Sequence, residues 1–167
     1  LVVAVVPTHT MRQVFSEIAS DLPPQVILVT ASKGIENESL LTMDQVLLQV
    51  LPSTLHDRIA VLSGPSFAKE TIEKHPTAVV AAAKQRAIAE AVQKAFQVGT
   101  FRVYTSDDVI GAEIGGAVKN VIAIACGIAD GLGFGHNTRA AVITRGLAEI
   151  TRLGVRLGCN PLTLAGL

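Results

Sequence analysis

The sequence predicts an α/β fold in which a parallel sheet domain is followed by the beginning of an all-α domain. Short aliphatic runs alternate with helical patterns up to Thr105, which is the order expected of βαβ units. Beyond Thr105 no strand-like run recurs, and Gly, Ala and aliphatic residues follow helical spacing. We therefore expect a sheet domain over residues 1–105 and a helical domain over residues 106–167.

The composition agrees with this fold class. Hydrophobic residues make up 49% of the chain while aromatic residues make up 4%, so Ala, Val, Leu and Ile must build the core, as in buried parallel sheets. The formal net charge is 0, which provides no electrostatic footprint for nucleic acid or anionic lipid. We expect neither kind of partner.

The first strands and helices follow from hydrophobic runs and their breakers. Residues 1–6 form a continuous aliphatic run closed by Pro7, and residues 26–30 form a second one. A helical spacing of apolar residues lies between them and ends at a pair of prolines. After a polar turn, either Ser39 or Thr42 can start the next helix.

The remaining sheet elements continue this alternation. Residues 59–62 and 77–83 are expected to be buried strands, separated by a loop and a short helix near residues 69–73. A helix is expected over residues 85–96. Residues 101–105 alternate apolar and polar side chains, which predicts a strand that is antiparallel or at the sheet edge.

The helical part should contain two long helices and the start of a third. We expect helices over residues 107–129 and 138–157, joined by a glycine-rich turn, and a third helix beginning at Asn160 and Pro161. Because the chain opens inside a strand-like run without Met, we expect it to be a piece of a longer protein.

The cysteines and the first six residues indicate where in the cell the protein is expected to lie. Cys126 and Cys159 lie in apolar surroundings without metal-ligand spacing, so we interpret them as reduced, structural thiols and expect no metal site. The apolar run at residues 1–6 is too short to span a membrane and lacks a basic signal-peptide region. We expect a soluble, cytoplasmic protein with no membrane insertion.

Loops that follow parallel strands have the strongest claim to bind a ligand. Pro7 follows the first strand and either runs along a cofactor or simply ends the strand. Lys33 follows the second, where it is either an ordinary surface lysine or a group that holds an anionic or carbonyl substrate. Gly64 and Ser66 follow the third, where a glycine allows close approach to the backbone and a serine supplies a donor.

The stretch "GAEIGGAVKN", residues 111–120, places one lysine among small residues. On a helix, Gly115 and Lys119 are one turn apart, while Glu113, Gly116 and Asn120 share a neighbouring face. Each glycine costs a helix about 1 kcal/mol relative to Ala, so a packing or ligand reason is expected. Spacing alone leaves two interpretations open: tight packing with Lys119 reaching solvent, or a lysine that projects into the interdomain cleft for proton transfer.

Several blocks of the chain resemble one enzyme family. "TASKGIE", "LSGPSFAKE", "SDDVIGAEIGGAVKNVIAIACGIADGLGFGHNTRAAVITRGLAEITRLG" and "NPLTLAGL" strongly resemble bacterial-type NAD(P)-dependent glycerol-3-phosphate dehydrogenases, and the match spans essentially the whole chain. The resemblance implies a Rossmann-type NAD(P)-binding domain followed by a helical substrate or dimerisation domain. It also implies an oxidoreductase that interconverts dihydroxyacetone phosphate and sn-glycerol 3-phosphate with NAD or NADP, for phospholipid synthesis.

The resemblance assigns roles to individual residues. Lys119 resembles the family's catalytic lysine, and Lys33 looks like the lysine that touches both substrate and nicotinamide. Gly64 and Ser66 resemble substrate contacts, and Asn120 is expected to assist Lys119 there. Ala68 resembles a cofactor contact, and Pro7 is also expected to contact the cofactor.

Parts of the family pattern are missing from these residues. The family has a glycine-rich turn that would lie before Leu1, and a "GDL" segment and an Arg-Asn pair that would lie after Leu167. We therefore expect these 167 residues alone to show no turnover. Coenzyme preference and oligomeric state stay open, with a homodimer possible.

Two other functions remain in view from the sequence. One is a related two-domain dehydrogenase acting on a hydroxy acid or sugar acid. The other is a non-catalytic helical interaction fragment, in which the glycines of residues 111–120 serve packing against a partner.

Overall fold

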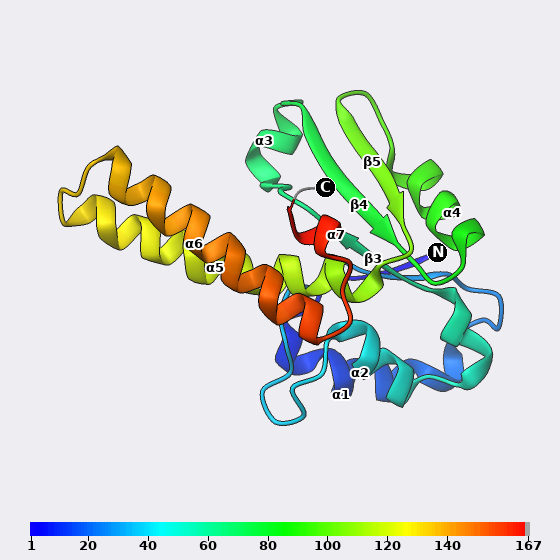
Figure 1. The fold of residues 1–167 in the computed structure, drawn as a ribbon. Coiled ribbons are helices and arrows are strands. Elements are labelled where there is room, and N and C mark those ends of the chain that lie inside the picture. Colours follow the sequence, from blue (N-terminus) through cyan, green and yellow to red (C-terminus); the bar gives the residue numbers. More distant parts are fainter. Residues whose placement is uncertain (166–167) are drawn as a thin grey trace.

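The computed structural model describes residues 1–165, in which a five-stranded sheet with its helices is followed by three further helices. Figure 1 shows their arrangement. The sheet part contains β1 (Val2–Ala4), α1 (Thr8–Ile18), η1 (Ala19–Asp21), β2 (Leu28–Thr30), α2 (Met43–Val50), η2 (Ser53–Arg58), β3 (Ile59–Ser63), α3 (Ala68–Ile72), β4 (Thr77–Ala82), α4 (Arg86–Phe96) and β5 (Phe101–Ser106). The helical part contains α5 (Val109–Gly131), α6 (His136–Arg156) and α7 (Pro161–Ala165). This confirms the predicted α/β class. Residues 166 and 167 of the predicted helical domain lie outside the described residues, and the boundary at 105/106 stays a prediction.

The strands follow one another across the sheet in chain order. β1, β2 and β3 pair in parallel, β3 and β4 pair antiparallel, and β4 and β5 pair in parallel. Residues 101–105 lie at the sheet edge, as predicted, and β5 is parallel to its neighbour β4 but antiparallel to β1, β2 and β3. The alternation there reflects one covered face, since Val103 is buried between the exposed Arg102 and Tyr104.

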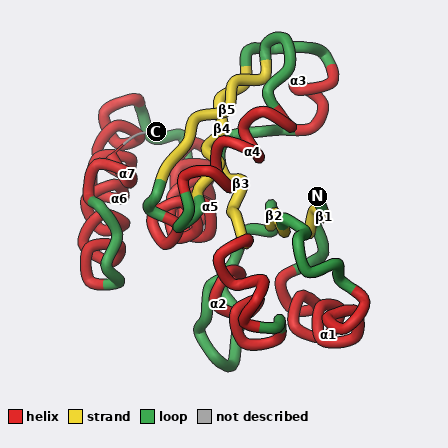
Figure 2. Tube along the Cα trace, turned by 90° about the vertical axis from the view of Figure 1, so that its right-hand side faces the viewer, coloured by secondary structure: helices red, strands yellow, loops and turns green. Residues whose placement is uncertain are grey.

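Alternate residues of β3 face two different layers of helices, which Figure 2 shows on either side of the strands. Val61 packs with β4 and the start of α5, and Ile59 packs with α1 and α2. Ala60 points the opposite way and packs with α4. By the same alternation, Ser63 at the end of β3 faces α5. The sheet thus presents the end of its central strand to the first helix of the helical part.

Side-chain caps fix the starts of helices α2 and α5. Thr42 forms a capping box with Gln45 at the start of α2, so Thr42 and not Ser39 begins that helix. Asp108 caps α5, because its Oδ1 accepts a hydrogen bond from the Gly111 amide at 2.9 Å. Its Oδ2 accepts another from the Asn160 amide at 2.9 Å, which ties the chain before α7 to the start of α5.

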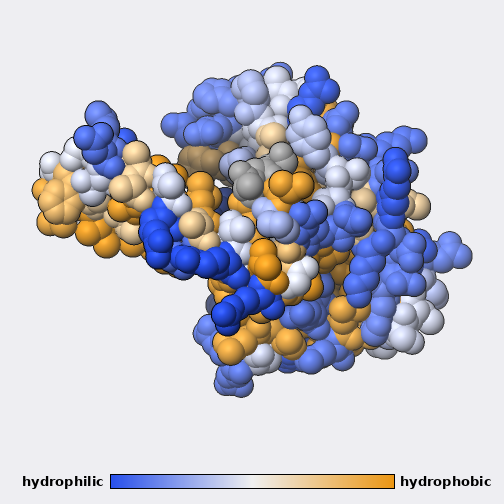
Figure 3. Space-filling view, viewed as in Figure 1, coloured by the Kyte–Doolittle hydropathy of each residue, from blue (hydrophilic) through white to orange (hydrophobic). Residues whose placement is uncertain are grey.

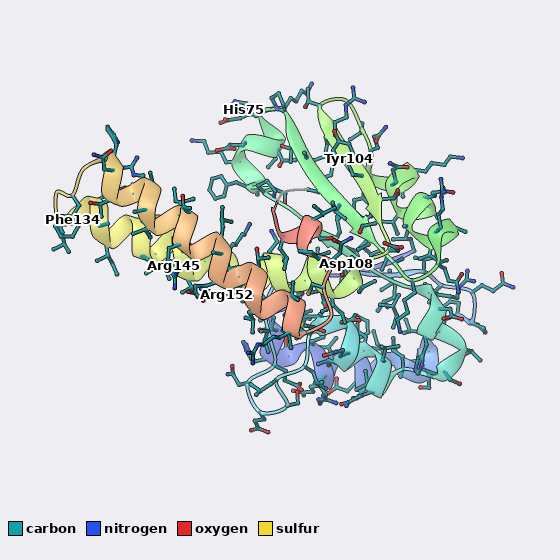
Figure 4. All side chains as sticks on the ribbon, in the orientation of Figure 1. His75, Tyr104, Asp108, Phe134, Arg145 and Arg152 are labelled. Atoms are coloured by element: carbon teal, nitrogen blue, oxygen red, sulfur yellow. The ribbon has the colours of Figure 1, made fainter. Side chains whose placement is uncertain are left out.

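Helices α5 and α6 form a hairpin that extends away from the sheet (Figure 1). Its tip carries Phe134, and the exposed Arg145 and Arg152 lie along α6 (Figure 4). Apolar side chains of outer α5, including Val121 and Ile124, are exposed, and Figure 3 shows an apolar band along the hairpin. By length and composition α5 could cross a membrane, yet its first residues are buried against the sheet and α2.

Candidate active site

A cavity of about 170 Å³ lies where the end of β3 meets α5 and α7. Its lining comes from the loop after β3, from the glycine-rich part of α5 and from α7: Ser63, Gly64, Pro65, Gly111, Ala112, Gly115, Gly116, Lys119, Thr163 and Leu164. Its position at the carboxyl end of a parallel strand, between sheet and helices, is where open α/β folds bind ligands. Its size suits a small ligand, since pockets for larger ones occupy about 300–1,000 Å³.

Lys33 reaches this site from the loop after β2. Its Nζ donates a hydrogen bond to the Gly64 carbonyl oxygen at 2.9 Å, which joins the loops after β2 and β3. Burial lowers the pKa of Lys33, and the adjacent ammonium of Lys119 lowers it further. The structure therefore brings two lysines together that are far apart in the sequence.

The glycines of α5 let this helix approach the rest of the protein closely. A Cβ on Gly116 would lie 2.8 Å from the Ser63 Oγ and 3.6 Å from the Lys33 Cγ, while one on Gly115 would lie 3.6 Å from the Leu164 Cδ2. A side chain at Gly116 would therefore have to displace the Ser63 hydroxyl, whereas Gly115 opens toward the cavity and α7. Gly116 thus allows α5 to pack on β3, and its neighbour Gly115 leaves space for the cavity.

Gly64 holds a backbone conformation that only glycine adopts readily. Its φ is 148°, and a Cβ there would lie 2.8 Å from the Val79 Cα and 2.9 Å from the Ala78 carbonyl oxygen. The loop after β3 can therefore lie directly on β4. This arrangement places the Gly64 carbonyl where Lys33 binds it.

Gly64 and Lys119 line the cavity, and the other predicted site residues do not. Ser66 is exposed, with its Oγ 3.4 Å from the Gly64 carbonyl oxygen, and Ala68 is the exposed first residue of α3. Pro7 is exposed at the N-cap position of α1. Asn120 is exposed on α5 next to Lys119. The structure thus gathers Lys33, Gly64 and Lys119, and their predicted roles remain proposals.

Sequence reasoning missed Ser63, Thr163 and Leu164. Ser63 could have been found, because it is a polar residue two positions after the inward-facing Val61 and is itself buried. Thr163 and Leu164 reach the cavity only because α7 folds back beside α5, and local sequence carries no signal of that contact.

The side chains around the site determine whether it could hold a metal ion or a cofactor. Within residues 1–165, no group of three or more His, Cys, Asp and Glu side chains is arranged to bind a metal. The carboxyl ends of β1, β2 and β3 lie side by side in parallel register, and their following loops carry Pro7, Lys33 and Gly64. Open α/β sheets bind ligands at such an edge, and here the Lys33 ammonium reaches the loop after β3.

A mostly parallel sheet, a following set of helices and two lysines near their junction form an α/β fold with a ligand site at the carboxyl ends of its strands. Two family models match the chain and make the assignment specific. The N-terminal part of NAD-dependent glycerol-3-phosphate dehydrogenase matches residues 1–89, and the C-terminal part matches residues 108–167. The chain belongs to the NAD-dependent glycerol-3-phosphate dehydrogenase family.

Individual relatives agree with the family models. The chain is 59% identical over 165 residues to a glycerol-3-phosphate dehydrogenase [NAD(P)+] of Geobacter sulfurreducens, covering 99% of this chain and 49% of the relative. It is 59% identical over 167 residues to the enzyme of that name from Myxococcus xanthus, covering 100% of this chain and 50% of the relative. The crystal structure of glycerol-3-phosphate dehydrogenase from Coxiella burnetii superposes with a TM-score of 0.89 at 37% identity, covering 99% and 50% of the two chains. The chain thus spans about half the length of the relatives it matches.

Proposed function

We propose that the protein interconverts dihydroxyacetone phosphate and sn-glycerol 3-phosphate by hydride transfer with NAD or NADP. The observation that carries this proposal is that Gly64 and Lys119 line one small cavity at the carboxyl end of β3, while Lys33 binds the Gly64 carbonyl. Family membership and the names of the relatives support the same reaction. The nicotinamide supplies the hydride for reduction and accepts it in oxidation.

The residues of this chain supply the proton and the positive field. Lys119 donates a proton to the oxygen on the second carbon as the ketone is reduced, and accepts one as the alcohol is oxidised. Lys33 holds the substrate beside the nicotinamide, and its charge stabilises the developing alkoxide. Gly64, Ser66 and Asn120 contact the substrate.

The cofactor side of the proposal rests on the loops after the strands. Pro7, Lys33 and Ala68 lie on segments that follow β1, β2 and β3, and we assign them to contacts with the cofactor. The division into a dinucleotide-binding domain over residues 1–105 and a helical domain over residues 106–167 belongs to the same proposal. We also propose a cytoplasmic location and a role in supplying phospholipid synthesis, with a homodimer as the form to be tested.

Protection of the lysines by ligands tests the substrate assignment. In the full-length protein, glycerol 3-phosphate should slow modification of Lys33 and Lys119 by an amine reagent, whereas a hydroxy acid should not. Mass spectrometry of the modified peptides reports each lysine separately. Protection by a hydroxy acid, with none by glycerol 3-phosphate, would replace the proposed substrate with that of a related dehydrogenase.

A further inference from the structure

A buried acidic pair joins α5 to α2 next to the candidate site. Asp44 at the start of α2 is 5% exposed and Glu113 on α5 is 6% exposed. The Glu113 Oε1 accepts a hydrogen bond from the Asp44 amide at 3.1 Å. Thr42, which caps α2, donates from its hydroxyl to the Asp44 Oδ1 at 2.6 Å. Two carboxyl groups, one from each part of the chain, therefore share one enclosed space.

The Glu113 side chain has unused bonding capacity. Its Oε2 is buried and has no hydrogen-bond partner among the described residues. Burial raises the pKa of Glu113 to about 9. The hydrogen bond to Asp44 and the charge of Asp44 also contribute to this increase. Near neutral pH the group is thus a neutral acid, whose Oε1 accepts from the Asp44 amide while the other oxygen can carry the proton.

This contact sets the position of the catalytic end of α5. Lys119 lies six residues beyond Glu113, or about 9 Å along the helix axis. Between them Gly116 fits against Ser63 with no room for a side chain, so a small slide or rotation of α5 changes where Lys119 points. The Glu113 contact with α2 opposes such movement.

We propose that Glu113 is a positioning residue, which fixes α5 on α2 and thereby sets the place of Lys119 relative to Lys33. The proposal rests on the proposed dehydrogenase function only for its kinetic readout. Asp44 is the titratable group in contact with Glu113, and His56 of η2 and Lys84 after β4 line a small cavity beside Asp44. Nothing in the proposal requires Glu113 to touch substrate or cofactor.

Glu113→Leu and Glu113→Gln in the full-length protein separate positioning from simple packing. Glutamine is neutral and keeps the acceptor for the Asp44 amide, so E113Q should retain kcat within about twofold. E113L should lower kcat by about tenfold or more, because displacement of a reacting group is costly. The KM for NADH or NADPH should stay within about twofold in both, because the cofactor loops are not altered. Glu149→Leu, on the exposed face of α6, is the matched control and should leave kcat unchanged.

A second readout does not depend on the reaction. The pH midpoint of amine modification at Lys33 should rise in E113L, because Lys119 moves away and no longer lowers the Lys33 pKa, and it should not rise in E113Q. Absence of turnover in the wild type would reject the proposed function, while this midpoint would still decide the role of Glu113. If E113L does not fold, Glu113→Asp, which is too short to reach the Asp44 amide, replaces it. A folded E113L or E113D with wild-type kcat and an unchanged pH midpoint for Lys33 modification would overturn the proposal. An E113Q variant with a kcat as low as that of E113L would also overturn it.

Discussion

Gly116 of α5 and Ser63 of β3 meet so closely that a Cβ on the glycine would lie 2.8 Å from the serine Oγ. This contact places Lys119, less than one turn further along α5, above the loop after β3. A helix that begins with a cap at Asp108 and is held by Glu113 therefore delivers its lysine to a defined point. The predictions below test this arrangement.

Replacement of the two adjacent glycines should have different effects on stability. Gly115→Ala meets only ordinary contact with Leu164 and gains helix propensity, so it should be neutral or stabilise by up to about 1 kcal/mol. Gly116→Ala must displace the buried Ser63 hydroxyl, and it should be less stable than Gly115→Ala by about 1–3 kcal/mol. Urea unfolding of both variants measures the difference. Equal stability would show that α5 does not depend on close approach at Gly116.

Gly64→Ala should be strongly destabilising because it combines an unfavourable φ with a backbone collision. The added Cβ would meet the Val79 Cα and the Ala78 carbonyl, neither of which can rotate away. Gly99→Ala is the matched control, since its φ is 54° but nothing lies within 4 Å of the added Cβ. The control should cost about 1–2 kcal/mol and Gly64→Ala should cost more. Thermal unfolding that ranks the two in the reverse order would contradict the described loop.

Glu113 should make the protein less stable as pH rises. Its pKa is about 9 in the folded state, above its ordinary value, so the folded state binds the extra proton in the interval between them. Stability from this group is present at low pH and is lost on going from about pH 5 to pH 9, with a slope of at most about 1.4 kcal/mol per pH unit. Glu113→Gln should flatten this decline in chemical denaturation measured across the interval. A wild-type curve and a variant curve with the same slope would show that Glu113 is ionised when folded.

Lys33 should react with amine reagents at lower pH than an ordinary lysine. Burial lowers its pKa first, and the charge of Lys119 lowers it further. Lys119→Met removes the second cause but not the first, so the midpoint of Lys33 modification should rise without reaching the ordinary lysine value. Peptide mass spectrometry as a function of pH gives the midpoint. If it does not move in the variant, the two ammonium groups are not adjacent in solution.

Much of the fold could be predicted because local signals agreed with tertiary structure. The capping residue Thr42 and the aliphatic runs of β3 and β4 each marked an element close to its observed bounds. The reversal between β3 and β4 could not be predicted, because strand direction depends on how the segment with α3 turns the chain, and the residues of both strands are compatible with either direction.

The candidate site was predictable only in part. Lys33 and Gly64 follow strands, so sheet topology alone indicated their edge, but their direct hydrogen bond depends on the two loops meeting. Spacing could not decide between packing and catalysis for Lys119, and the resemblance to a family favoured catalysis. The partnership of Glu113 with Asp44 joins residues that are distant in the chain, and no local pattern indicates it.

Turnover by the full-length protein and its Lys119→Met variant tests the central claim most directly. NADH and NADPH oxidation should be measured with dihydroxyacetone phosphate, with circular dichroism to show that both proteins are folded. We predict turnover in the wild type with at least one coenzyme and a loss in kcat of about 100-fold or more in the variant, as expected when a proton donor is removed. A folded variant with wild-type kcat would contradict the assignment of Lys119 as the catalytic acid and base.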